Sequence, residues 1–151
     1  MDIKVILHPT DGSKNADKAL ALACDLALAK QARLLILHVQ RRHGGDQIPP
    51  DLVDYARWEG IQETEAELMR SAAKSIGERA EKNARGHGVK LIETIVVEGD
   101  PARKIGEIAK DRNVDMIVMG SRGLGDLQGL LLGSVSHKVA SSTPCTCTIV
   151  R

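Results

Sequence analysis

Residues 116–136 read MIVMGSRGLGDLQGLLLGSVS, and this stretch decides the fold class. It begins with an apolar run at 116–119, which is short and uninterrupted and therefore predicts a strand near the centre of a sheet. A glycine-rich segment follows from Gly120 to about Gly133, and the pattern after it predicts a helix over about 134–142. A strand, a connecting loop and a helix in this order form the repeating unit of a parallel α/β sheet.

The same alternation of strand and helix extends outward from this stretch. Further strands are predicted at residues 3–7, 34–39, 91–97 and 146–150, further helices at about 14–30, at about 51–86 and after residue 100, and a loop at 41–50. Glu93 and Thr94 interrupt the apolar pattern of the third strand, as expected at a sheet edge, and Asp100-Pro101 is a typical helix start. Strands joined through helices predict a single α/β domain over residues 1–151, an open parallel five-stranded sheet with helices on both faces.

Length and composition narrow the class of protein. The chain has 151 residues, with 21 Lys and Arg against 20 Asp and Glu, and with one Trp, one Tyr and no Phe. Interspersed charges and almost no aromatic side chains for stacking argue against nucleic acid as a partner. The N-terminus shows no signal region and no apolar stretch is long enough to span a bilayer, so we expect a cytoplasmic protein with no membrane partner. In that compartment Cys24, Cys145 and Cys147 are expected as free thiols.

Two polar loops follow the first and fourth strands. One loop is residues 9–13 (PTDGS), and the other is residues 120–123 (GSRG). In open parallel sheets ligands bind at the carboxyl ends of the strands, where the strand order reverses. If the first and fourth strands are neighbours, these loops meet and form the candidate site.

The glycine-rich segment allows two interpretations. In one it cradles phosphates, because glycine lets the backbone approach an anion, the following helix has free N–H groups at its start, and Arg122 adds a charged contact. In the other the glycines are ordinary turn residues and Ser134 is an ordinary N-cap. The leucine-rich residues 124–132 are long for a strand-to-helix connection, which favours a lid over a ligand or a partner surface. Asp11 also allows two interpretations. In one its carboxylate accepts hydrogen bonds from ribose hydroxyl groups. In the other Asp11 or Ser13 only caps the helix that follows.

The spacing of these residues resembles a known family signature. The nucleotide signature of the universal stress protein family is matched without a gap by Gly120, Gly123, Gly133 and Ser134. Two residues separate the first two glycines, and nine separate Gly123 from Gly133. Residues 6–13 (ILHPTDGS) resemble the first strand and acidic turn of that family. His38-Val39 and the segment from Pro144-Cys145 onward resemble the ends of its second and closing strands. The chain therefore resembles the ATP-binding subgroup of this family over essentially its whole length.

This resemblance implies a strand order of 3-2-1-4-5 and binding of ATP, with Mg²⁺ as the accompanying ion. It also implies three parts of a nucleotide site. Asp11 would contact the ribose, and the adenine pocket would be lined by Pro9, Thr10, Val39 and Met119. The phosphates would be surrounded by Gly120, Arg122, Gly123, Gly133, Ser134, Val135 and Ser136. It further implies a homodimer that pairs through the last strand. In that strand Cys145 to Thr148 stand where the family more usually has aliphatic residues.

Three classes of function remain to be distinguished. No Walker lysine follows the first strand, and Asp126 is the acid nearest to the glycine segment, so we assign no catalytic residues. We expect a nucleotide-dependent switch in stress response or signalling, with at most slow ATP hydrolysis. The alternative is an ATPase or phosphotransferase with an unidentified substrate. A redox or metal protein is the third class, but Cys145 and Cys147 match no common zinc spacing and are expected to be core or interface thiols.

Overall fold

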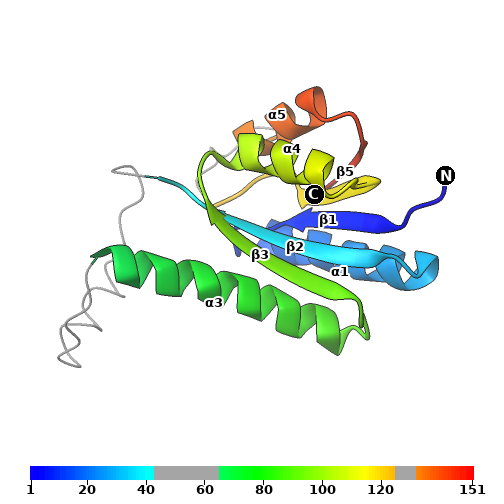
Figure 1. Cartoon of the computed structure of the whole chain (residues 1–151), viewed down its shortest axis with the longest axis horizontal. Coiled ribbons are helices and arrows are strands. Elements are labelled where there is room, and N and C mark those ends of the chain that lie inside the picture. Colours follow the sequence, from blue (N-terminus) through cyan, green and yellow to red (C-terminus); the bar gives the residue numbers. More distant parts are fainter. Residues whose placement is uncertain (43–64, 125–131) are drawn as a thin grey trace.

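A computed structural model describes residues 1–42, 65–124 and 132–151 of the chain. The strands are β1 (Val5–Pro9), β2 (Arg33–Gln40), β3 (Ile92–Glu98), β4 (Met116–Gly120) and β5 (Thr146–Val150), and the helices are α1 (Lys14–Lys30), α3 (Glu65–Gly86), α4 (Pro101–Asp111) and α5 (Ser134–Ser142) (Figure 1). The predicted elements are confirmed within these residues. The predicted loop at 43–50, the predicted helical residues 51–64 and the glycine-segment residues 125–131 lie outside the described residues.

All four strand pairings are parallel, and the order in the sheet is β3-β2-β1-β4-β5. This confirms the predicted fold class and the predicted strand order. β3 forms one edge of the sheet, as the polar residues in its sequence indicated. β1 and β4 lie side by side in the middle of the sheet. The connection after β1 leads to β2 on one side of this pair, and the connection after β4 leads to β5 on the other side, so the strand order reverses between them.

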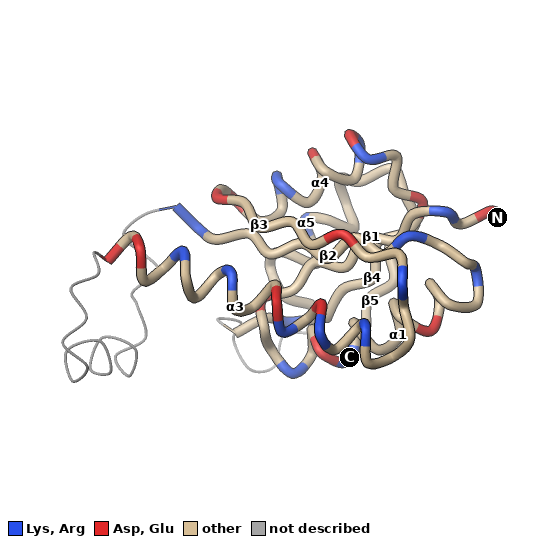
Figure 2. The backbone as a smooth tube through the Cα atoms, turned by 60° about the horizontal axis from the view of Figure 1, so that its bottom comes forward, with Lys and Arg blue, Asp and Glu red and all other residues tan. Residues whose placement is uncertain are grey.

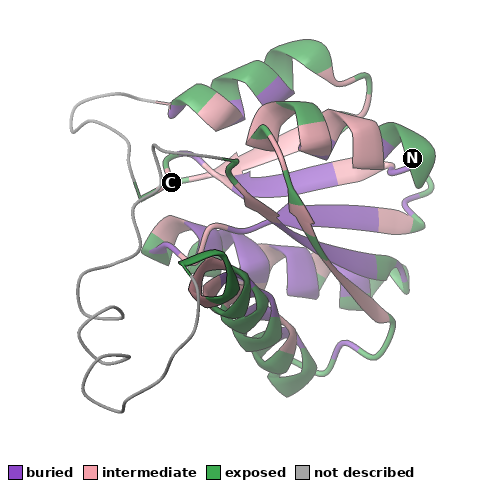
Figure 3. Cartoon of the chain, turned by 60° about the vertical axis from the view of Figure 1, so that its left-hand side comes forward, coloured by how far each residue is buried: buried purple, intermediate pink, exposed green. Residues whose placement is uncertain are grey.

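The two faces of the sheet carry two separate apolar cores. Ile6 and Leu34 point to the face covered by α1 and α3, whereas Leu7 and Leu35 point to the face covered by α4 and α5. Successive side chains of a strand alternate between faces, so a continuous apolar run fills both cores at once. Figure 3 shows the middle of the central strands buried between the two helical layers.

Charged residues lie mainly on the helices and the connecting segments, with both signs interspersed (Figure 2). β1 and β4 carry no charged residue. No helix among residues 1–42, 65–124 and 132–151 is long and apolar enough to cross a membrane.

β1 begins and ends two residues later than predicted. The amide groups of Lys4 and Val5 both donate to Asp115 Oδ2, at 2.8 and 2.9 Å, so the start of this segment is held by a side chain. At the other end Pro9 remains in the strand although proline lacks an N–H group. Thr10 N instead donates to Leu37 O at 2.8 Å, which continues the pairing with β2 past the proline.

Gly120 ends β4 where the strand packs against the first turn of α1. A Cβ atom at Gly120 would lie 2.9 Å from the backbone carbon of Asn15 and 3.1 Å from the amide nitrogen of Ala16. Backbone atoms cannot move aside as the end of a flexible side chain can. The packing of β4 against α1 therefore requires glycine at this position.

His8 is a completely buried imidazole in the centre of β1. Its Nδ1 lies 2.9 Å from Val118 O, and because a carbonyl only accepts, Nδ1 carries the hydrogen. Nε2 then has a free lone pair, and no described residue donates to it. Burial lowers the pKa of His8 to about 4, opposed in part by the Val118 carbonyl and by the carboxylates of Asp17 and Asp11.

Replacing Gly120 with alanine should destabilise the fold by about 1–3 kcal/mol, because the added methyl group is pressed against the backbone of α1. The matched control is Gly106→Ala in α4, where a Cβ would lie 3.9 Å from Thr143 Cγ2, an ordinary contact. That change should leave stability unchanged or raise it by roughly 0.5–1 kcal/mol, because alanine favours a helix. Urea unfolding compares the two variants, and an equal effect of both would contradict the packing role of Gly120.

The buried imidazole should make stability depend on pH. Because the pKa of His8 is about 4 in the folded chain, whereas an unperturbed histidine has a pKa of 6.5, the unfolded chain binds more protons between these pH values. The contribution of His8 to the free energy of unfolding is complete above about pH 6.5. It is lost as the pH falls toward 4, and the total loss is about 3 kcal/mol. His8→Asn keeps an N–H donor for Val118 O but cannot be protonated in this range.

Urea unfolding from pH 4 to 7 measures this difference. The wild type should lose more stability than His8→Asn as the pH falls, whereas the carboxylates and the other histidines contribute equally to both proteins. Parallel curves for the two proteins would show that His8 is not the buried group responsible.

Candidate functional site

The loops that follow β1 and β4 meet at the carboxyl edge of the sheet. Leu124 N donates to Asp11 Oδ2 at 2.9 Å, joining two segments 113 residues apart. This confirms the prediction that the two polar loops lie together where the strand order reverses. It also brings the predicted residues at the ends of β1 and β4, namely Pro9, Thr10, Asp11, Met119 and Gly120, to one place in the fold.

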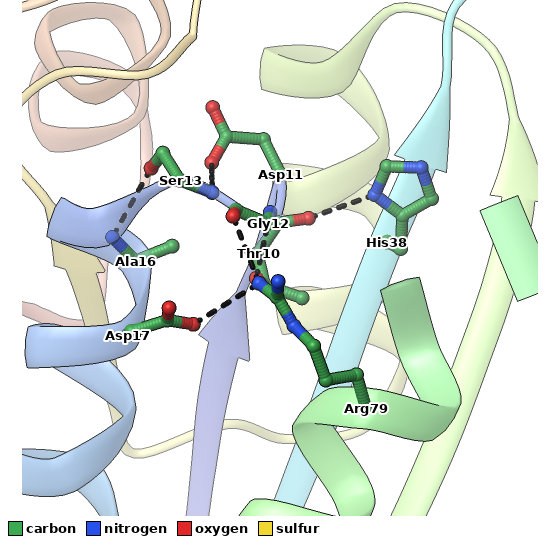
Figure 4. A network of polar contacts seen from close by, with 8 residues as sticks. All are labelled: Thr10, Asp11, Gly12, Ser13, Ala16, Asp17, His38 and Arg79. Atoms are coloured by element: carbon green, nitrogen blue, oxygen red, sulfur yellow. Dashed lines mark hydrogen bonds and ion pairs between the residues drawn. The ribbon is translucent and has the colours of Figure 1, made fainter. Parts of the chain in front are cut away.

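The turn after β1 is held by its own side chains (Figure 4). Ser13 N donates to Asp11 Oδ1 at 2.9 Å, and Gly12 N donates to Thr10 Oγ1 at 3.2 Å. Gly12 has a φ of +80°, a conformation that favours glycine. The turn therefore has one compact conformation that directs the Asp11 carboxylate toward Leu124.

Ser13 and Asp11 have separate roles. Ser13 is the N-cap of α1, and its Oγ accepts a hydrogen bond from Ala16 N at 3.2 Å. Asp11 does not cap that helix. Each of its carboxylate oxygens accepts one backbone N–H group and keeps a further lone pair, so the carboxylate can still accept hydroxyl groups of a ligand.

Three predicted apolar contacts lie at the carboxyl ends of adjacent strands. Pro9 ends β1, Val39 lies near the end of β2, and Met119 lies near the end of β4. Val39 and Met119 belong to the apolar core on the side of α4 and α5. Pro9, Val39 and Met119 therefore lie at the same edge of the sheet as the polar turn.

The two ends of the glycine segment are joined through Ser121, a residue the sequence analysis did not single out. Gly133 N donates to Ser121 O at 2.6 Å, and Ser136 Oγ donates to the same oxygen at 2.7 Å. Ser121 N donates in turn to Val150 O at 2.7 Å. Strand alternation is the signal that could have found it, because Met119 points toward α5 and the residue two positions later must do the same.

This closure changes the expected role of Ser136. Its hydroxyl group is buried and lies within hydrogen-bond distance of two carbonyl oxygens, Ser121 O at 2.7 Å and Gly133 O at 3.1 Å. The family resemblance implies that Ser136 is one of the residues that surround the phosphates. In this structure its hydroxyl hydrogen serves the base of the loop, and the backbone N–H of Ser136 is the group that remains for an anion.

The N-terminus of α5 differs from those of α1 and α4. Ser13 caps α1 and Asp100 caps α4, whereas Gly133 is the N-cap of α5 and provides no side-chain hydrogen bond. Ser134 is thus the first residue of the helix rather than its N-cap, which corrects one of the two interpretations of this residue. The amides of the first turn have no carbonyl four residues earlier in the helix, and the helix dipole is positive here.

The remaining predicted residues surround this helix end. Ser134 is exposed and Val135 is half-buried in the first turn of α5. Arg122 is exposed and Gly123 is half-buried in the segment between Ser121 and Leu124. The arrangement therefore brings three apolar strand ends, a carboxylate and a helix start without a side-chain cap to one edge of the sheet.

The cysteines do not form a reactive or metal-binding site in the described part of the chain. All three are free thiols. Burial raises the pKa of Cys24 to about 11 and raises the pKa of Cys145, so both stay protonated and weakly nucleophilic near neutral pH. Within residues 1–42, 65–124 and 132–151 no group of three His, Cys, Asp or Glu side chains could hold a metal ion.

Comparison with known proteins adds an independent observation. The sequence pattern of the Universal stress protein family matches residues 2–151. The chain is 40% identical over 146 residues to universal stress protein YxiE of Bacillus subtilis, and the match covers 97% of each chain.

Two solved structures are similar over nearly their full length. One is MJ0577 of Methanocaldococcus jannaschii, with 29% identity, a TM-score of 0.76 and coverage of 99% of this chain and 96% of that one. The other is a universal stress protein solved in complex with cAMP, with 26% identity, a TM-score of 0.71 and coverage of 100% and 99%. With its family pattern, its full-length relatives and its strand order in agreement, the chain belongs to the universal stress protein family.

Proposed function

We propose that this protein binds an adenine nucleotide, with ATP and its Mg²⁺ as the main ligand, at the carboxyl edge of β1 and β4. It acts as a nucleotide-dependent switch in stress response or signalling, with at most slow hydrolysis of ATP. The observation that carries this proposal is the uncapped N-terminus of α5 at the same edge of the sheet as the Asp11 turn.

The phosphate end of the ligand is assigned to the start of α5 and the glycine segment. Anions bind at helix N-termini because free N–H groups and the helix dipole both favour negative charge. The N–H groups of Ser134, Val135 and Ser136 supply this site. Gly120, Gly123, Gly133 and Arg122 complete the proposed phosphate-binding set: the glycines leave room for the phosphates, since the N–H of Gly133 is already used by Ser121 O, and Arg122 adds a positive charge for the outer phosphates.

The nucleoside end is assigned to the turn after β1. Asp11 accepts the ribose hydroxyls with the lone pairs that Ser13 N and Leu124 N leave free. Pro9, Thr10, Val39 and Met119 line the adenine side. The similar structure in complex with cAMP, a ligand with adenine, ribose and one phosphate, supports a nucleotide of this kind.

The proposed role as a switch is supported by the contact between the two loops of the site. The groups that hold the nucleotide belong to two loops that touch through Asp11 and Leu124, so a ligand between them changes the contact between the loops. A Mg²⁺ ion would arrive on the phosphates of the nucleotide. The predicted alternative, an ATPase or phosphotransferase, would need rapid, substrate-dependent turnover that is lost in Arg122→Ala or Asp11→Ala.

We further propose that two copies pair through β5 in the cytoplasm. β5 is an edge strand of the sheet, and edge strands carry unpaired backbone groups that favour pairing with another chain.

Binding is tested most sharply by Ser134→Pro. Proline at the first position of a helix keeps the helix but removes one N–H group, and Gly133 already has the extended conformation that precedes proline. We expect ATP to bind about tenfold more weakly by calorimetry, with adenosine unchanged and thermal stability preserved. Ser134→Ala, which removes the hydroxyl group and keeps the N–H, should bind ATP nearly as the wild type does.

Asp11→Ala supplies the complementary result. It should weaken the binding of adenosine and of ATP to a similar degree, because both ligands carry the ribose.

Mass spectrometry of the purified wild type should find an adenine nucleotide that is lost in Gly123→Val. A wild type that takes up no adenine nucleotide at millimolar ATP and Mg²⁺ would overturn the proposed function.

The pairing of two copies is tested by sedimentation of the wild type with and without ATP. We expect the mass of a dimer in both conditions. A monomer at all concentrations would contradict pairing through β5 and would leave the nucleotide site unaffected.

A further inference from the structure

The turn between β1 and α1 is also held from outside, by side chains of two other elements. His38 Nδ1, on β2, donates to Thr10 O at 2.8 Å. Arg79 Nη2, on α3, donates to Gly12 O at 2.8 Å. Figure 4 shows Arg79 reaching the turn from the side opposite to the Asp11 carboxylate.

The contact of Arg79 acts on the peptide group that holds Asp11. The carbonyl of Gly12 and the N–H of Ser13 belong to one planar peptide, and in a trans peptide they point in opposite directions. Arg79 binds the carbonyl end of this peptide, and Asp11 Oδ1 binds its N–H end at 2.9 Å. Fixing one end therefore fixes the direction of the hydrogen bond that holds the carboxylate.

The conformation of Gly12 makes this restraint useful. Its φ of +80° lies in a region that glycine can leave easily, so the peptide after it can rotate unless something holds it. Ile76 lies one helical turn before Arg79 on α3, and its Cγ1 and Cγ2 atoms would lie 3.5 and 3.7 Å from a Cβ placed at Gly12, so they limit the space around this residue. α3 thus contacts the turn through both an apolar and a charged side chain.

Arg79 adds little to the stability of the fold by its charge. Its ion pair with Asp17 has an Nη2–Oδ1 distance of 3.3 Å, and the two side chains are 52% and 46% exposed. Exposed ion pairs at this distance contribute little to the free energy of unfolding. The main consequence of this side chain is therefore the geometry of the turn.

We propose that Arg79 is a positioning residue for the nucleotide site: it orients the Gly12–Ser13 peptide and thereby holds the Asp11 carboxylate toward the ligand. This inference rests on the nucleotide binding proposed above. Arg79 does not touch the ligand, and it acts on the ligand through the Asp11 carboxylate at the ribose end. α3 thereby becomes part of the binding apparatus although none of its residues lines the site.

Calorimetry of Arg79→Gln tests the inference with adenosine, AMP and ATP. We expect all three ligands to bind about tenfold more weakly, because all three carry the ribose that Asp11 accepts. Arg79→Lys still supplies a charged donor to Gly12 O and should restore most of the affinity. In an Asp11→Ala background, Arg79→Gln should have no further effect.

Two control variants separate this role from general effects of charge and stability. Asp17→Asn removes the ion pair but leaves the hydrogen bond to Gly12, and it should bind as the wild type does. Arg85→Gln removes another exposed arginine of α3, paired with Glu81 at 2.8 Å and remote from the turn, and it should also have no effect. A loss that grows with the number of phosphates would show direct contact with the ligand and overturn the inference.

A second measurement needs no ligand. Amide hydrogen exchange of Ser13 in the free protein should become faster in Arg79→Gln and return toward the wild-type rate in Arg79→Lys. Unchanged exchange and unchanged affinity in Arg79→Gln would overturn the positioning role while the nucleotide site stands. If the wild type binds no adenosine ligand, the proposed function fails, and the exchange rates alone decide whether Arg79 orients the turn.

Discussion

The parallel pairing of β1 with β4 is the constraint on which the rest of the structure depends. It joins segments more than one hundred residues apart, with Ile6 opposite Met116 and Leu7 opposite Ile117. An aspartate secures each end of the pair. Asp115, before β4, accepts the amides at the start of β1, and Asp11, after β1, accepts an amide from the loop after β4. Because both strands run in the same direction, their two loops must then meet at one edge.

The candidate site is built largely from backbone groups, and the rest of the fold decides which of them remain available. Ser121 uses its carbonyl and its amide to join the two ends of the glycine segment to β5. Because Gly120 has no side chain, the first turn of α1 can pack directly against it. α1 and α4 use their own side chains as caps, whereas α5 does not. At the carboxyl edge of the sheet the start of α5 is thus left without a side-chain cap, and the Asp11 turn lies at the same edge.

The turn after β1 shows how distant elements control a short segment. Residues 10–13 receive hydrogen bonds from β2 and α3 as well as from their own side chains. Each of these hydrogen bonds contributes little free energy alone, but together they hold the turn in the conformation of this structure. The sheet provides the position of the Asp11 carboxylate, and α3 provides its orientation.

Within the described residues, the amino-acid sequence by itself determined the strands, the helices, the parallel sheet and the edge at which the two polar loops meet. These features follow from local periodicity and from turn residues, which act over a few positions along the chain. Only the tertiary structure decided the use of Gly120 for helix packing, of Ser121 and Ser136 for closing a loop, and of Arg79 for holding a turn. The partners in these contacts are brought together by the folding of the chain. Strand alternation could have indicated which way Ser121 faces, but no spacing within the sequence shows which groups it, Gly120 or Arg79 meets.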